Sequence, residues 1–167
     1  MDRIGLTYGI WEVLLRLSLA MLVGGALGLN RELHGKPAGV RTHALVSIGA
    51  ALITLITLQL SHSSSGDLGA VSRSIQGIIT GIGFIGAGVI LRDDLRRSVH
   101  GLTTAATIWL VASLGMACGL GQWRTALATL GVTLFVLVFG GPVERFVHGR
   151  LHPGEPMGCD EGEGPLK

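Results

Sequence analysis

Apolar residues gather in five long runs along the chain, with short polar segments between them. The runs cover residues 10–29, 44–60, 75–91, 102–120 and 125–141. Each is about 17–20 residues long, enough for an α-helix to cross a hydrocarbon core of about 30 Å. The runs lack the alternating apolar and polar residues of membrane β-barrel strands. In lipid, the remaining way to hydrogen-bond every backbone group is an α-helix, in which the bonds form within one segment. The pattern predicts an all-α integral membrane protein with a bundle of about five transmembrane helices.

Composition agrees with a membrane protein and excludes an ordinary soluble domain. The 167 residues are enough for one domain, and 48% of them are hydrophobic but only 14% are charged. Soluble domains carry about 25% charged residues, so this chain has too little charge to cover a globular surface. Most of its 27 glycines lie inside the apolar runs, as is typical of packed transmembrane helices.

The third run contains a G-x-G-x-x-G sequence, formed by Gly81, Gly83 and Gly86. A dinucleotide-binding turn needs a strand before it, a helix after it and an acid about 20 residues later. Here the glycines lie within one unbroken apolar run, and Ala106 stands where the acid should be. We therefore reject an NAD site and expect these glycines to pack helices closely, which makes the third helix the most crowded one. The glycines expected to pack in this way are Gly77, Gly81, Gly83, Gly86 and Gly88.

Basic residues predict the orientation in the membrane. Nine of them follow the first, third and fifth runs, and three lie on the opposite side. The positive-inside rule places the amino terminus outside and the carboxyl terminus in the cytoplasm. A cleaved signal peptide is the alternative for the first run, but the run is long and contains polar residues. We expect a transmembrane domain over residues 1–143 and a short cytoplasmic tail over 144–167, disordered because it is acidic and rich in Gly and Pro.

Motifs for catalysis or metal binding are missing from the sequence. No phosphate-binding loop, nucleophile motif or paired-cysteine spacing occurs, and the six histidines are scattered. We expect the histidines to be solvated residues at the membrane interface, with no metal, cofactor, nucleic acid or enzyme activity. Glu12 and Arg16 are one helical turn apart, with the acid first, which is the favourable order for an ion pair.

A mixed-sign cluster follows the first run. Basic residues alone would suffice to anchor the chain to anionic headgroups, and this is one interpretation. The acid in the cluster and the turn at Pro37 instead favour a charge network that holds helix ends together, or a site for an ion or a partner. The cluster consists of Arg31, Glu32, Lys36, Arg41 and Thr42.

Three blocks, NRELHGKPAGVRTHALVSIGAAL, DLGAVSRSIQGIITGIGFIGAGVIL and VHGLTTAATIWLVASLGMACGLG, resemble the membrane domain of the MgtC/SapB family. The likeness runs from about residue 12 to residue 141. It implies a multi-pass protein of the bacterial inner membrane, tied to growth when magnesium is scarce and, in pathogens, to survival inside host cells. Beside the first cluster, the family motif implies a second polar site near the membrane. That site would consist of Asp67, Arg73, Gln76, Thr103 and Thr104.

Two classes of function remain from the sequence. The first is a non-enzymatic membrane protein that binds other inner-membrane proteins under stress. The second is a small transporter or channel for Mg²⁺ or another solute, which should carry ionisable residues along its path. The nearly neutral interiors of the runs favour the first class. The sequence leaves open whether the bundle binds a second copy of itself.

Overall fold

The described part of the chain folds as a bundle of five membrane-length helices. The computed structural model describes residues 8–63, 68–93 and 98–151. Its helices are α1 (Ile10–Leu33), α2 (Val40–Ser63), α3 (Leu68–Val89), α4 (Leu102–Gly119) and α5 (Trp123–Leu151). All five are long and apolar enough to cross a membrane. The predicted all-α membrane bundle is confirmed, whereas the orientation of the termini stays a prediction.

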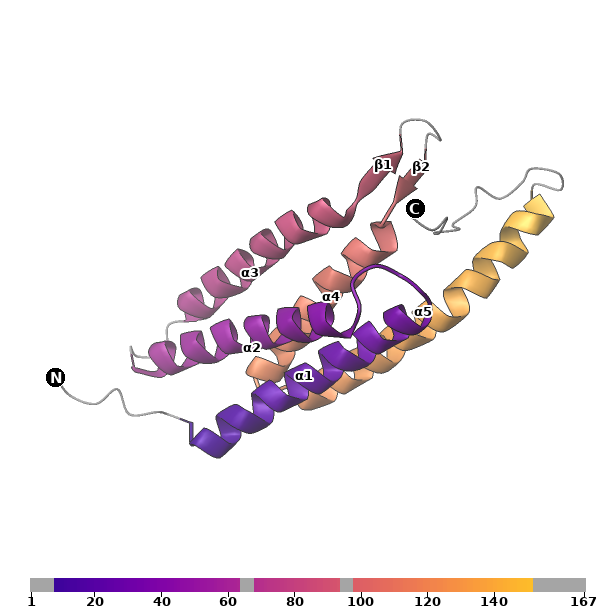
Figure 1. Ribbon diagram of the computed structural model, residues 1–167. Coiled ribbons are helices and arrows are strands. Elements are labelled where there is room, and N and C mark those ends of the chain that lie inside the picture. Colours follow the sequence, from indigo (N-terminus) through magenta and orange to yellow (C-terminus); the bar gives the residue numbers. More distant parts are fainter. Residues whose placement is uncertain (1–7, 64–67, 94–97, 152–167) are drawn as a thin grey trace, which may run out of the picture.

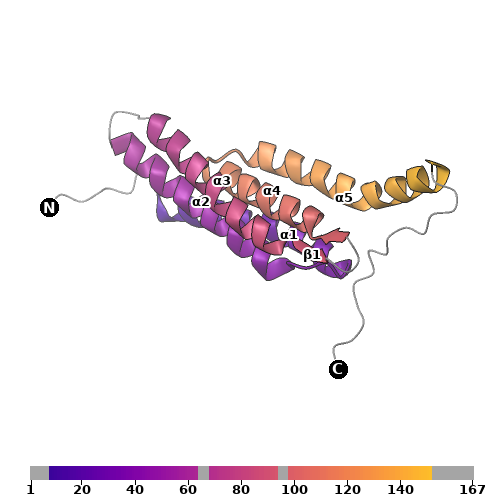
Figure 2. The same ribbon diagram turned by 90° about the horizontal axis from the view of Figure 1, so that it is seen from above.

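The α4 helix lies at the centre of the bundle and contacts each of the other four helices. Over half of its span, 56%, is buried, against 11% for the spans of α3 and α5. Figure 1 shows α3 along one edge of the bundle, and Figure 2 shows α5 along another. The expectation that the third helix is the most crowded is therefore wrong. Its glycines resemble packing motifs in sequence, but the fold places α3 at an edge.

Close packing occurs where α2 passes between α1 and α4. A Cβ atom at position 24 or 28 of α1 would lie 2.6 Å from the carbonyl oxygen of His43 or 2.7 Å from the Cα of Val40. On α4, a Cβ atom at position 115 would lie 2.2 Å from the carbonyl oxygen of Ser47. Helices in lipid gain dispersion energy by such close approach. Glycines on α1 and α4 thus let both helices touch the backbone of α2.

The glycines of α3 have a different environment. A Cβ atom at position 77, 81, 83 or 88 would have no atom within 4 Å apart from its own helix and chain neighbours. At Gly86, which is buried, it would lie 3.7 Å from the Cβ of Ala105, an ordinary contact. Four of the five expected packing glycines therefore make no close helix contact within this chain. They lie on the part of α3 that faces away from α2 and α4.

A short hairpin joins α3 to α4, although the sequence analysis predicted only helices and linkers. Strand β1 (Leu91–Asp93) pairs antiparallel with β2 (Ser98–His100). Gly101 then turns the chain into α4 with φ 86°. A Cβ atom there would lie 2.2 Å from the carbonyl oxygen of Val89. Glycine fits this turn because it has no Cβ and tolerates positive φ.

The α5 helix ends later than expected. It continues to Leu151, so the expected disordered tail over 144–167 begins inside a helix. Past residue 141 the sequence keeps apolar residues at helical spacing, namely Val143, Phe146 and Val147. The remainder of the expected tail, residues 152–167, lies outside the described residues.

Candidate functional site

The last turn of α1 contributes a buried cation to the bundle. The Arg31 side chain is 5% exposed, and its Nη2 atom donates a hydrogen bond of 2.5 Å to Oγ1 of Thr104 in the first turn of α4. A positive charge near a helix C-terminus is favourable, and burial of a charge requires polar partners. Arg31 thus connects the end of α1 to the start of α4.

A buried histidine on α2 extends this connection. The Nδ1 atom of His43 lies 3.1 Å from the carbonyl oxygen of Gly39, and its Nε2 atom lies 3.2 Å from Oγ1 of Thr107. The Thr107 hydroxyl also donates to the carbonyl oxygen of Thr104 at 2.9 Å. Arg31, His43, Thr104 and Thr107 therefore form one buried polar group, named here the Arg31 cluster, which joins three helices.

The hydrogen-bond chemistry of His43 and Thr107 is linked. The Gly39 carbonyl only accepts, so Nδ1 carries a proton, and in the neutral ring Nε2 can pair with Thr107 only by accepting its hydroxyl proton. That hydroxyl has one proton, which it gives either to His43 or to the carbonyl of Thr104. The state of the His43 ring and the direction of the Thr107 hydrogen bond are therefore coupled.

His43 and Thr107 were missed by the sequence analysis. The histidines were expected to be solvated, but His43 is 0% exposed, so that expectation is wrong for His43. The available signal was its place directly before the second apolar run, because an ionisable residue carried into a membrane helix usually has a buried polar partner. Only the fold shows that this partner is Thr107 of α4.

The first predicted cluster divides in the structure. Glu32 follows Arg31 in sequence, but its Oε2 atom accepts the backbone N–H of Val40 at 3.0 Å, at the start of α2. A carboxylate at a helix N-terminus satisfies a free donor and complements the helix dipole. Arg41 and Thr42 are exposed, and Lys36 is half-buried in the connecting turn. Arg31 and Glu32 therefore serve different helix ends, and a functional role for the cluster stays a prediction.

The second predicted polar site is not brought together. Arg73 and Gln76 are exposed near the start of α3, whereas Thr103 and Thr104 begin α4. The α3 helix and the hairpin separate these two groups along the chain, so they lie at opposite ends of an antiparallel pair. Gln76 donates to Oγ of Ser72 at 3.3 Å. Asp67 lies outside the described residues.

The opposite end of the bundle is joined by Arg16. Its guanidinium pairs with the carboxylate of Glu12, as their spacing predicts, and its Nη1 donates to the carbonyl oxygen of Gly119 at 2.6 Å. The Tyr8 ring lies 4.5 Å from the guanidinium carbon. Arg16 therefore satisfies a carbonyl at the C-terminus of α4 and links it to α1, so an arginine of α1 contacts each end of α4.

Metal-binding groups are not found in the described part of the chain. No group of three or more His, Cys, Asp or Glu side chains is placed to hold an ion there. Acidic residues are scarce too: the candidate spans contain only Glu12 and Glu32, which lie at opposite ends of α1.

Similarity to known proteins identifies the family of this fold. The model of the MgtC family matches residues 17–146, which include most of all five helices. The chain belongs to the MgtC family. It is therefore a multi-pass protein of the bacterial inner membrane, and the resemblance of the three sequence blocks is confirmed.

Relatives of this MgtC family chain carry different names. Protein SrpB of Synechococcus elongatus is 46% identical over 145 residues, which cover 82% of this chain and 80% of that protein. Protein MgtC of Salmonella typhimurium is 44% identical over 125 residues, which cover 75% of this chain but 51% of that protein. The chain thus spans about half the length of that relative.

A third relative has transport in its name. Putative magnesium transporter YhiD of Escherichia coli is 39% identical over 149 residues, which cover 84% of this chain and 66% of that protein. No solved structure matches the chain. A membrane role connected with magnesium fits the names of these relatives.

Proposed function

We propose that this chain is a non-enzymatic inner-membrane protein that supports growth at low magnesium by binding and modulating other membrane proteins. The observation that carries the proposal is the closed packing of α1, α2 and α4. The carbonyl oxygens of His43, Ser47 and Ala51 lie against glycines of the neighbouring helices. Backbone in contact at these levels leaves no room for a hydrated ion between the three helices.

Electrostatics support the same proposal. Magnesium prefers carboxylate and water oxygens in an octahedral shell. The described interior instead holds the Arg31 cation, and α2, α3 and α4 contain no acidic residue within their bounds. A buried positive charge repels a divalent cation. A pathway for Mg²⁺ through the centre of one chain is therefore disfavoured, and surfaces for other proteins remain.

Magnesium transport by the chain itself is the second candidate. The name of the YhiD relative, at 39% identity, is the specific observation in its favour. A transporter alternates between conformations, and a path that is closed in one of them can open in another.

A flux assay separates the two candidates. The purified chain is reconstituted into vesicles with a Mg²⁺-sensitive dye inside, with and without a membrane potential and a pH gradient. We expect Mg²⁺ to enter these vesicles no faster than it enters protein-free vesicles. The gene for the same chain should nevertheless restore growth of a deletion strain at limiting magnesium. Saturable Mg²⁺ entry that depends on the protein would refute the modulator proposal and establish the transporter.

A crosslinking assay tests the partner directly. In one variant, a photoreactive amino acid replaces the exposed Arg41. In a matched control variant, it replaces the exposed Trp123 at the other end of the bundle. When magnesium is limiting, we expect the probe at position 41 to crosslink this chain to another protein of the inner membrane. Growth rescue without any captured protein from either position would count against modulation.

A further inference from the structure

The Arg31 cluster contains a histidine whose hydrogen bonds depend on one proton. In the neutral ring, Nδ1 of His43 donates to the carbonyl oxygen of Gly39. The single proton of the Thr107 hydroxyl then goes either to Nε2 of His43 or to the carbonyl oxygen of Thr104. In the protonated ring, Nε2 donates to Thr107 and leaves the hydroxyl proton to Thr104. All three hydrogen bonds therefore form together only when the ring carries a positive charge.

The gain of this hydrogen bond is opposed by the burial of charge. The His43 side chain is 0% exposed, and the buried guanidinium of Arg31 binds Oγ1 of Thr104 in the same cluster. Protonation of the ring would thus bury a second cation in the cluster. Removal of a charge from water costs more than one hydrogen bond returns. The closed cluster therefore holds the neutral ring, whereas a ring in contact with water accepts the proton freely.

The charged groups around His43 do not offset this cost. Within the described bounds of α1, α3 and α4, which pack against α2, the acid at this end of the bundle is Glu32. Its carboxylate is exposed and already accepts the N–H of Val40. Arg41 of α2 is exposed and adds positive charge. The other ionisable residues within the bounds of α1–α4 lie nearer the opposite end of the bundle; they are Glu12, Arg16, His62, Arg73 and Cys118. Arg31 is therefore the main charge that opposes an imidazolium at His43.

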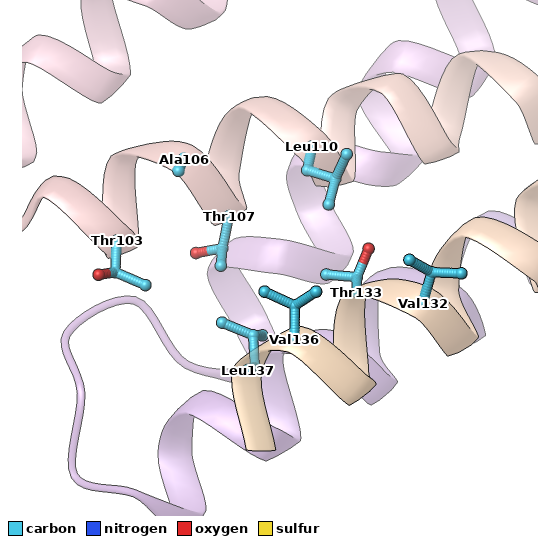
Figure 3. Close-up of a pocket in the computed structure, with 8 residues that line it drawn as sticks. All are labelled: Thr103, Ala106, Thr107, Leu110, Val132, Thr133, Val136 and Leu137. Atoms are coloured by element: carbon cyan, nitrogen blue, oxygen red, sulfur yellow. The ribbon is translucent and has the colours of Figure 1, made fainter. Parts of the chain in front are cut away.

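The start of α4 has room to move away from the cluster. Thr107 lines a crevice of about 260 Å³ between α4 and α5. Figure 3 shows Thr107 on the side of α4 that faces α5, with Val136 and Leu137 across the crevice. The tight backbone contacts of α4 with α2, at Gly115 and Gly119, lie more than two turns further along the helix. The first turns of α4 can therefore tilt toward α5 while the remainder stays packed on α2.

We propose that His43 is a proton-operated switch at the junction of α1, α2 and α4. The closed junction holds the neutral ring, and the open junction exposes the ring and holds the imidazolium. Acid favours the open state because that state binds more protons. Histidine is the side chain that ordinarily titrates between about pH 5 and 8, so the switch responds to mild acid. This switch is independent of whether the chain modulates other proteins or transports Mg²⁺.

A pair of spin labels across the junction tests the switch. The labels replace Leu33 at the end of α1 and Leu102 at the start of α4, which are both exposed, in a chain whose two cysteines are changed to alanine. Their separation is measured in lipid nanodiscs at about pH 7.5 and about pH 5.5, on either side of the titration of free histidine. We expect a second, longer distance in acid. Its ratio to the short distance should rise about tenfold, as for one ring that titrates near about pH 6.5 and binds its proton only in the open state.

Two variants separate His43 from other effects of acid. His43→Gln keeps a polar side chain without a titrating group, so the distances should no longer depend on pH. His34 provides the matched control, because its Nδ1 lies 2.6 Å from the carbonyl oxygen of Asn30, four residues back as in the His43–Gly39 pair, but its ring is exposed. His34→Gln should respond to acid like the parent. A response that survives His43→Gln, or a parent without a response, would overturn the switch.

A second measurement reads the ring itself and needs no change at the junction. Nitrogen NMR of histidine-labelled protein in nanodiscs distinguishes the two neutral forms of each ring from the imidazolium. At about pH 7.5 we expect His43 to carry its proton on Nδ1, and at about pH 5.5 we expect both ring nitrogens to be protonated in the open population. A neutral ring with its proton on Nε2, or a ring that stays neutral while the distance changes, would refute the proposed exchange of hydrogen bonds.

Discussion

Replacement of Gly115 by alanine tests the close packing at the centre of the bundle. A Cβ atom there would lie 2.2 Å from the carbonyl oxygen of Ser47 and 2.9 Å from both the carbonyl carbon and Cα of that residue. All three atoms belong to the backbone, so no side-chain rotation relieves the overlap. Ordinary C···O contacts begin at about 3.3 Å. The α2 and α4 helices would therefore have to separate by roughly 1 Å locally.

The size of the effect follows from two opposing contributions. Overpacking a tight site costs about 1–3 kcal/mol. Alanine in a helix interior is favoured over glycine by about 0.5–1 kcal/mol. We expect Gly115→Ala to lower the free energy of unfolding by roughly 1–2 kcal/mol after this offset.

Gly81 provides the matched control, because a Cβ atom there meets no atom within 4 Å. Gly81→Ala keeps the gain in helix propensity without the overlap, so it should be neutral or slightly stabilising. Both variants are unfolded in mixed micelles with increasing SDS, and retention of the folded bundle is followed by size exclusion. Gly119→Ala, with a contact of 2.7 Å to the carbonyl oxygen of Ala51, should fall between them. The packing argument fails if Gly115→Ala is as stable as Gly81→Ala.

Three further predictions concern charge and orientation. Arg31→Lys should lower the free energy of unfolding by about 1–3 kcal/mol, because lysine lacks the planar guanidinium that reaches Thr104. The control Arg124→Lys should change that free energy little, because Arg124 lies over the exposed ring of Trp123. Unfolding of both variants in SDS tests this prediction. Glu32→Gln keeps an oxygen that can accept the Val40 N–H, so at matched abundance it should restore growth at limiting magnesium better than Glu32→Ala. Equal rescue by both variants would show that the hydrogen bond from Val40 to residue 32 is not needed for function. A reporter active only in the periplasm should be silent when fused after Lys167 and active when inserted near Ser64, and the opposite result would reverse the predicted orientation.

The number and type of the helices could be read from the sequence alone. Hydrocarbon thickness sets the minimum length of each apolar run, and the need to satisfy backbone hydrogen bonds sets its helical form, whatever its neighbours are. The same is true of the Glu12–Arg16 pair, because four residues of one helix bring both side chains to one face. Such local rules do not depend on which helices meet.

Which glycines pack could not be read from the sequence. Gly77 and Gly81 have the same four-residue spacing as Gly24 and Gly28 or as Gly115 and Gly119. Only the second and third pairs face α2, because the fold places α4 at the centre and α3 at an edge. The spacing shows that a helix can approach another closely, whereas the arrangement of the helices decides whether it does.

The Arg31 cluster has the same limit. The sequence placed Arg31 beside Glu32, and their opposite charges suggested one network. In the fold, the two side chains leave α1 in different directions, toward Thr104 of α4 and the first turn of α2. The partners of a side chain at a helix end depend on the neighbouring helices. His43 and Thr107 belong to the cluster because α2 packs against α4, and the sequence does not show that packing.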